Sequence, residues 1–407
     1  MPVGLSAPRD LLPVSGVRLA TAEAGIRYAG RRDLTLIHLD PGTRVAGVFT
    51  RNRFRAAPVL VAEAHLAAGR EIRALVINTG NANAGTGETG LRSAQESCEA
   101  VALALGCTSG QVLPFSTGVI GEPVDLAARI RGALPGCVPA LDRNGWNGAA
   151  QAILTTDTVA KAFSRQVEVD GRPVTVTGMA KGSGMIRPDM ATMLAFIATD
   201  AAVEKAALDE LLHRAVDASF NRITVDGDMS TNDACILMAT GQAGNGPVES
   251  GSAGFGRLRE AVQEVALALA QAIVRDGEGA TKFIPVRVSG GKNPAECLQV
   301  AYRMAHSPLI KTAFFASDPN WGRLLAAIGS AGVEDLDVRQ VQISLGGLCI
   351  VRQGARDPAY TEAAGQAVMA REEIPVHVDL GRGTAEEEIW TCDLSHEYVR
   401  INAEYRS

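Results

Sequence analysis

Short runs of apolar residues alternate with turns over the first third of the chain, and longer helical patterns follow. Runs with the composition of strands occupy residues 34–39, 44–50 and 72–78. A loop rich in Asn, Gly and Ala comes after the third run, and residues 91–105 then show the three- and four-residue spacing of a helix. This alternation of strands and helices predicts a layered α/β or α+β domain.

The middle of the chain repeats the same kind of alternation. Residues 174–180 form a predicted strand, residues 181–190 a Gly-rich loop and residues 191–200 a second apolar strand. A helix is predicted over 203–219, and a strand resumes at 222–227. The apolar face of that helix consists of Val203, Ala207, Leu208, Leu211, Leu212 and Ala215.

The clearest helix is predicted over 257–275 and ends at the pair Asp276 and Gly277. Its apolar positions recur at three- and four-residue steps: Leu258, Val262, Val265, Leu269 and Ile273. Residues 281–290 return to strand. Because 407 residues exceed what one ordinary core covers, we expect two lobes.

Charge and composition exclude several classes of protein. A net charge of -6 and an aromatic content of 4% do not suit binding to a nucleic acid. The seven cysteines contain no CxxC pair, so neither a disulfide framework nor a metal site is indicated. The chain start lacks a signal-peptide pattern, and no apolar run approaches the ~18 residues of a membrane span. We therefore expect a cytoplasmic protein with no membrane partner.

One segment combines features that suit self-cleavage. Thr192 follows the small residue Ala191 after a loop that contains Pro188 and several glycines, so the peptide bond between the two can be held in a strained turn. The Thr192 hydroxyl could attack the Ala191 carbonyl in an N-to-O acyl shift, and hydrolysis would release a threonine with a free α-amine. Such an amine, with a pKa of about 7.7–8.0, can serve as the base of its own hydroxyl. Composition alone favours the plainer interpretation, a strand residue with a satisfied hydroxyl.

The segment GMAKGSGMIRPDMATMLAF at 178–196 resembles the self-processing signature of the ornithine acetyltransferase (glutamate N-acetyltransferase) family. Segments similar to the family extend over nearly the whole chain in the family's order. They are GVFTRNRFRAAPV at 47–59, NTGNANAGTG at 78–87, STGVIGEP at 116–123, ILTTDT at 153–158, FNRITVDGDMSTND at 220–233, DGEGATKF at 276–283, SDPNWGR at 317–323 and RINAEYRS at 400–407.

The resemblance implies an N-terminal-threonine nucleophile fold of the ornithine acetyltransferase type, with two lobes. It implies cleavage between Ala191 and Thr192 into an α chain, 1–191, and a β chain, 192–407, assembled as α2β2. We expect the strands on either side of the cleavage point to belong to one sheet, so that the two pieces stay associated.

The resemblance also implies a reaction in which an acetyl group passes from N-acetylornithine to glutamate in arginine biosynthesis, by a ping-pong mechanism through acetyl-Thr192. Thr117 and Gly118 would supply the oxyanion hole. No cofactor is implied, and whether acetyl-CoA is a second donor stays open. The implied substrate contacts are Thr155, Thr156, Lys181, Thr192, Glu278, Asn402 and Ser407. The family often ends in Thr where this chain has Ser407, which keeps a hydroxyl.

Three other functions are compatible with parts of the sequence. GTGETG at 85–90 matches the dinucleotide fingerprint, but the predicted strand ends at Asn78 and no acidic residue follows about 20 residues later to bind a ribose. An amidase or aminopeptidase with an N-terminal Thr would share the nucleophile and pass the acyl group to water. A non-catalytic binding protein would keep an intact chain.

Overall fold

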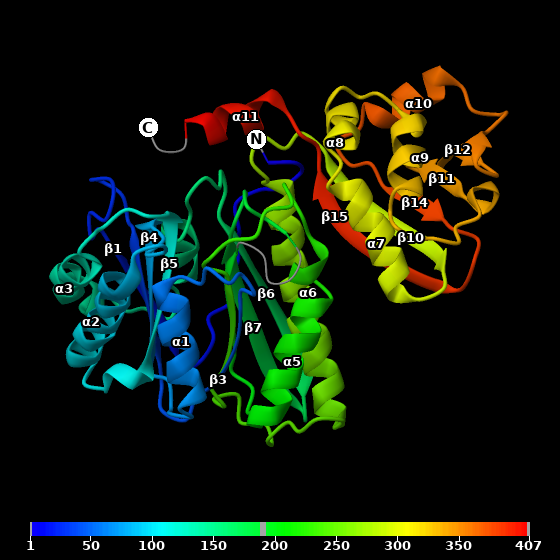
Figure 1. Ribbon diagram of the computed structural model, residues 1–407. Helices are drawn as coiled ribbons and strands as arrows, with labels where there is room; N and C mark the ends of the chain where they lie inside the picture. Colours follow the sequence, from blue (N-terminus) through cyan, green and yellow to red (C-terminus); the bar gives the residue numbers. More distant parts are fainter. Residues whose placement is uncertain (1, 188–192, 405–407) are drawn as a thin grey trace. The chain divides into compact units, whose positions relative to one another are not determined.

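The computed structural model describes residues 2–187 and 193–404, and the chain divides into two compact units. The larger unit comprises Ala7–Asn221 and Asp228–Ile273, and the smaller unit comprises Met1–Ser6, Arg222–Gly227 and Val274–Ser407. The expected layered mixture of helices and strands is confirmed, as Figure 1 shows. The division into units does not follow the predicted cleavage position, because the strands on both sides of it belong to the larger unit.

The larger unit contains two sheets. The first has the strand order β1-β2-β4-β5, and the second has the order β3-β9-β8-β7-β6. The strands of the first sheet are β1 Val17–Ala22, β2 Leu34–Leu39, β4 Ala74–Asn81 and β5 Val112–Val119. Those of the second are β3 Arg44–Phe49, β6 Lys161–Val169, β7 Arg172–Lys181, β8 Leu194–Thr199 and β9 Ala234–Ala239.

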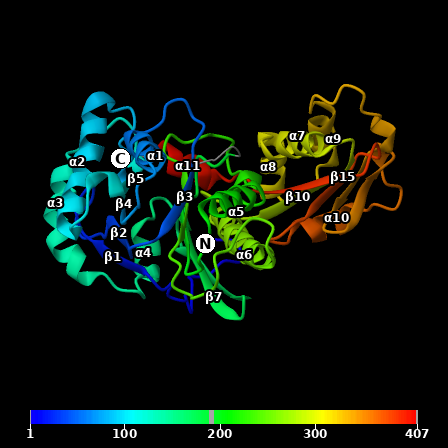
Figure 2. The same ribbon diagram turned by 90° about the horizontal axis from the view of Figure 1, so that it is seen from below.

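Helices cover the outer faces of the two sheets, so the larger unit has four layers (Figures 1 and 2). Helices α2 and α3 pack on the first sheet through a cluster that contains Val101, Ile130 and Val76. Helices α5 and α6 lie beyond the second sheet, where Val265 and Leu269 of α6 contact Gly178 of β7. The helices are α1 Ala57–Ala67, α2 Gly87–Leu105, α3 Leu126–Cys137, α4 Trp146–Ala152, α5 Lys205–Asp217 and α6 Ala253–Arg275.

The facing sides of the two sheets share one apolar core. Ile37, Leu75 and Phe115 of the first sheet belong to the same buried cluster as Phe196 and Ile236 of the second. The rings of Phe115 and Phe196 meet edge to face with centroids 5.1 Å apart. This contact brings the middle of β5 against β8, the first strand after the predicted cleavage position.

Most elements predicted from apolar spacing are confirmed within a few residues. The helix predicted over 203–219 is α5, and the one predicted over 257–275 is α6. All the residues assigned to the apolar faces of these two helices are buried. The loop predicted over 181–190 lies between β7 and β8, which pair antiparallel in one sheet as expected.

The strand predicted over 222–227 is wrong. Phe220–Arg222 forms a turn of 3-10 helix, and Ile223 makes a single bridge with Trp390. Gly227 has a φ of +84°, which ends any extended run. Ile223 and Val225 are nevertheless buried, so the apolar pattern reflects burial of a connecting segment and not pairing within a sheet.

The smaller unit contains a sheet with the order β13-β12-β11-β14-β10-β15. Its core joins this sheet to helices through Val300, Phe314 and Ile343. The strands are β10 Phe283–Gly291, β11 Gln342–Leu345, β12 Leu348–Arg352, β13 Ala355–Arg356, β14 Val376–Asp379 and β15 Ala385–Cys392. The helices are α7 Pro294–Ala305, α8 Pro308–Phe315, α9 Trp321–Gly329, α10 Glu362–Met369 and α11 His396–Ala403. Within the described ranges, no helix has both the length and the apolar character needed to cross a membrane.

Replacing Phe196 by alanine should lower the free energy of unfolding by about 3–5 kcal/mol, because it removes a fully buried ring from the core between the two sheets. Urea titration followed by circular dichroism measures this change. As a control, Leu103→Ala removes an apolar side chain that is 88% exposed on α2. That variant should change the same quantity by less than about 0.5 kcal/mol. Equal effects of the two substitutions would contradict a shared core.

Candidate functional site

The predicted oxyanion residues lie near the end of β5, where it runs parallel to β4. Thr117 pairs with Thr79 and Gly118 pairs with Gly80, and the register of the two strands shifts immediately afterwards. Gly118 has a φ of +133°, and a Cβ added there would lie 2.3 Å from the carbonyl carbon of Gly80. Only glycine fits this position, because any side chain would collide with the backbone of β4.

The side chain of Lys181, at the end of β7, reaches across to Thr117. Its Nζ donates to Thr117 Oγ1 at 3.1 Å, and both side chains are buried. An ammonium group has no acceptor, so the Thr117 oxygen must accept in this contact, and its own hydrogen can point to a different acceptor. Lys181 thus orients the Thr117 hydroxyl as a donor, which is the function that an oxyanion hole requires.

A buried carboxylate fixes the start of the loop that follows Lys181. Asp157 Oδ1 accepts hydrogen bonds from Gly182 N and from Lys161 Nζ, each at 2.7 Å. Asp157 Oδ2 accepts from Thr155 N at 3.1 Å. These contacts join the loop at 155–157, the first residue of β6 and the end of β7 at one point.

The pKa of Asp157 reflects this environment. Burial by itself raises the pKa, but the ammonium groups of Lys161 and Lys181, together with the Gly182 amide, outweigh it and hold the pKa of this carboxyl well below its usual range. Asp157 is therefore ionised at neutral pH. The buried pair that it forms with Lys161 is a structural anchor at the edge of the site.

The predicted threonines lie beside the same loop. Thr155 contributes the backbone amide that Asp157 accepts, and the Thr156 hydroxyl is 2.7 Å from the hydroxyl of Ser183. The structure thus brings Thr117, Lys181, Thr155 and Thr156 to one region of the larger unit. Sequence reasoning missed Asp157 and Lys161, although a lysine in the apolar run VAKAF, four residues after an aspartate, is a usable signal for a buried ion pair.

Two further predicted residues contact each other in the smaller unit. Asn402 Nδ2, on α11, donates to Glu278 Oε2 at 2.8 Å, and Glu278 is buried. Helix α11 lies tight against this loop, since a Cβ on Gly279 would lie 2.5 Å from Tyr398 N. Two of the implied substrate contacts, Glu278 and Asn402, are therefore directly bonded to each other.

The predicted cleavage pair, Ala191 and Thr192, and the predicted contact Ser407 lie outside the described residues. Lys181 pairs with Leu194 across β7 and β8, and Met193 is buried.

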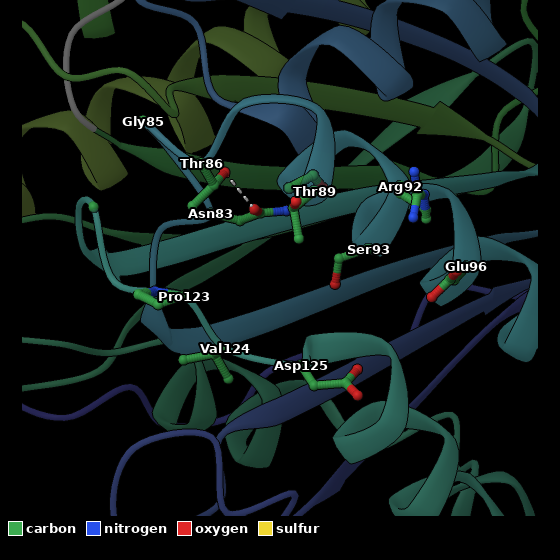
Figure 3. Close-up of a pocket in the computed structure, with 12 residues that line it drawn as sticks. Asn83, Gly85, Thr86, Thr89, Arg92, Ser93, Glu96, Pro123, Val124 and Asp125 are labelled. Carbon is green, nitrogen blue, oxygen red and sulfur yellow. Dashed lines mark hydrogen bonds between the residues drawn. The ribbon is translucent and has the colours of Figure 1, made fainter.

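The GTGETG match belongs to a separate pocket of about 710 Å³ in the larger unit, shown in Figure 3. The Thr86 hydroxyl donates to Asn83 Oδ1, and Asn83 Nδ2 donates to Gly90 O, both at 2.9 Å. A Cβ on Gly90 would lie 1.8 Å from Thr86 Oγ1. The glycine is thus required by the packing of the loop on itself. Of the predicted site residues that the structure describes, none lines this pocket.

Replacing Lys161 by methionine should lower the free energy of unfolding by about 3–5 kcal/mol, because the Asp157 carboxylate stays buried without its ion-pair partner. The double variant Asp157→Asn, Lys161→Met should recover most of that loss, since both charges are gone. Urea titration at neutral pH compares the three proteins. A Lys161→Met protein as stable as the unmodified chain would contradict the anchor.

The same anchor predicts a pH dependence. The pKa of Asp157 is lower in the folded chain than its unfolded value of about 3.9, so the stability that it contributes is present above that pH and is lost as the pH falls further. Between about pH 4 and pH 2, the unmodified chain should therefore lose stability more steeply than the double variant.

A side chain at an unfavourable φ costs about 1–2 kcal/mol. Replacing Gly118 by alanine should lower the free energy of unfolding by more than this, because the new methyl group also collides with β4. The matched control is Gly121→Ala, whose φ is also positive but whose Cβ meets nothing within 4 Å. Thermal unfolding of the two variants separates strain from collision, and equal losses would contradict the close approach.

A sequence model of the ArgJ family matches residues 18–407. Among solved structures, the chain is similar to the arginine biosynthesis bifunctional protein argJ from Bacillus halodurans, with 37% identity and a TM-score of 0.49 over 51% of this chain and 97% of that chain. It is similar to the ornithine acetyltransferase from Mycobacterium tuberculosis, solved with ornithine, with 37% identity and a TM-score of 0.38 over 43% of this chain and 92% of that chain. It is also similar to the L-aminopeptidase D-Ala-esterase/amidase from Ochrobactrum anthropi, with 12% identity and a TM-score of 0.38 over 66% of this chain and 89% of that chain. Since the family match covers nearly the whole sequence, the chain belongs to the ArgJ family.

Proposed function

We propose that this chain, an acetyltransferase of arginine biosynthesis by its family, moves an acetyl group from N-acetylornithine to glutamate through an acetyl-Thr192 intermediate. The protein first cleaves its own backbone between Ala191 and Thr192, and the chains 1–191 and 192–407 then assemble as α2β2. The proposed chemistry uses no metal and no organic cofactor.

One observation carries the proposal: Lys181 donates to the hydroxyl of Thr117 at the strand end that pairs with Leu194. The predicted oxyanion donors therefore lie beside the two strands that flank the predicted nucleophile. The resemblance assigns two separate segments to one reaction, at 116–123 and 178–196. Their contact in the larger unit supports that assignment.

Each half-reaction needs a nucleophile, a base and a site for a negative oxygen. After cleavage, the Thr192 hydroxyl attacks the acetyl carbonyl, and its own α-amine takes the hydroxyl proton. The tetrahedral oxyanion accepts hydrogen bonds from the Thr117 hydroxyl and the Gly118 amide, each worth about 2.7–4 kcal/mol of barrier. The bond between the acetyl carbon and the ornithine nitrogen breaks, and that nitrogen takes the proton back from the Thr192 ammonium. The glutamate amine then attacks the acetyl ester, its proton passes through the Thr192 α-amine, and the Thr192 oxygen leaves as the hydroxyl.

The charges of the amino acid substrates need partners. We assign a substrate carboxylate to Lys181, and Thr155 and Thr156 to neutral contacts beside it. Glu278, whose carboxylate is held by Asn402, is assigned to a substrate ammonium group. Ser407 is proposed as a further contact through its hydroxyl.

Intact-mass spectrometry of purified protein tests the proposal directly. The unmodified protein should give two chains, and the one beginning at Thr192 should gain the mass of one acetyl group with N-acetylornithine. Thr192→Ala should give one chain of 42.6 kDa, with no acetyl adduct and no transfer to glutamate, because both the attacking oxygen and the new α-amine are absent.

Thr192→Ser is the control, since it keeps a hydroxyl and should keep cleavage. Transfer by an uncut chain would contradict the mechanism. Acetate release that does not depend on glutamate would instead identify an amidase that passes the acyl group to water. Adding acetyl-CoA in place of N-acetylornithine decides whether it is a second donor.

A further inference from the structure

A second buried carboxyl group lies close to the predicted cleavage position and has a different environment from Asp157. Asp233 precedes the first residue of β9 and is 1% exposed. Neither of its carboxyl oxygens has a hydrogen-bond partner among the residues that the structure describes. Other buried carboxylates of this chain are held by backbone amides, as Asp157 is by Gly182 and Asp200 is by Thr175.

The position of Asp233 is fixed by the central strands of the second sheet. Strands β8 and β9 run parallel, with Leu194 opposite Ala234, and Ala234 N donates to Met193 O at 3.1 Å. The backbone amide of Met193 also acts on the Asp233 carboxyl. Met193 directly follows Thr192 in the chain, so the amide that acts on this carboxyl belongs to the residue next to the proposed nucleophile.

The neighbours of the carboxyl leave it in its acid form. Burial raises the pKa of Asp233 well above its usual range, and the Met193 amide and the Lys181 ammonium oppose this effect without reversing it. The nearby hydroxyls of Ser230 and Thr50 are uncharged, and they also lower the pKa without reversing the effect of burial. Burial therefore favours the protonated form of Asp233, the form that can donate a proton.

We propose that Asp233 is the general acid of the self-cleavage, an inference that rests on the proposed function. As the Thr192 hydroxyl oxygen bonds to the Ala191 carbonyl carbon, the bond from that carbon to the Thr192 nitrogen breaks. Asp233 gives its proton to the departing nitrogen and receives the proton of the hydroxyl, so it ends in the form in which it began. The product is an ester of Thr192 with a free amine, and water then hydrolyses the ester.

A purely structural role explains the residue poorly. A buried carboxyl without hydrogen bonds lowers the stability of a fold, and an apolar residue of similar size would fill the same space without that cost. A neutral acid at this place gains a use only if a proton must be delivered there.

Asp233→Asn is the decisive variant, since it keeps the shape and the neutral charge of the acid but cannot transfer a proton. It should be cleaved at least about 100-fold more slowly than the unmodified chain, as measured by intact mass over time. It should unfold within a few degrees of uncut Thr192→Ala. A variant that fails to unfold cooperatively would also overturn the assignment, because a site that holds a neutral acid tolerates its amide.

Asp200→Asn is the matched control, because Asp200 is a buried carboxyl at the opposite end of β8 whose pKa burial also raises. It should be cleaved at the unmodified rate. Hydroxylamine separates the two steps, since it cleaves the ester but not the amide. Asp233→Asn should stay intact with hydroxylamine, and cleavage by hydroxylamine would show that the ester forms without Asp233. An unmodified chain that is never cut would refute the proposed function itself, whereas an Asp233→Asn chain cut at the unmodified rate refutes only this inference.

Discussion

The contact between the Asp157 carboxylate and the Gly182 amide is the constraint on which the candidate site depends. It ties the loop at 155–157 to the end of β7, and Lys161 neutralises the charge in a place that water does not reach. Because Gly182 is fixed, the residue before it is fixed as well, and the Lys181 ammonium is held at the Thr117 hydroxyl. The geometry of an oxyanion donor on β5 is thus set by a carboxylate that touches neither β5 nor its hydroxyl.

Within the same buried region, the pKa values of two carboxyl groups shift in opposite directions. Asp157 has two ammonium groups nearby and amides that donate to it, so its pKa falls. The carboxyl oxygens of Asp233 have no hydrogen-bond partner within the described part of the chain, and burial outweighs the Lys181 ammonium, so its pKa rises. One carboxyl is therefore suited to hold backbone in place, and the other to exchange a proton.

The sequence predicts the parts of this fold whose signal is local. The helix α6 and the strands β7 and β8 follow from periodic apolar positions. The family-like segments assign Thr117 and Lys181 to one site, and their side chains are hydrogen-bonded in the structure. The pair of Asp157 and Lys161 was not predicted, because its burial depends on β6 pairing with β7 and α4 covering them. The strand predicted over 222–227 is wrong for a related reason, because burial of a connecting segment, and not pairing within a sheet, produces its apolar pattern.

The strand order of the second sheet has a consequence for a chain that is cut before β8. The order β3-β9-β8-β7-β6 alternates between the two pieces, since β3, β7 and β6 come from the first and β9 and β8 from the second. This sheet is complete only when both pieces are present, so it must form before the backbone opens. Once opened and unfolded, the protein would have to re-form by a collision of two incomplete molecules, a second-order process that slows on dilution. Such a cut would convert a foldable precursor into an enzyme that stays folded only while its two pieces remain associated.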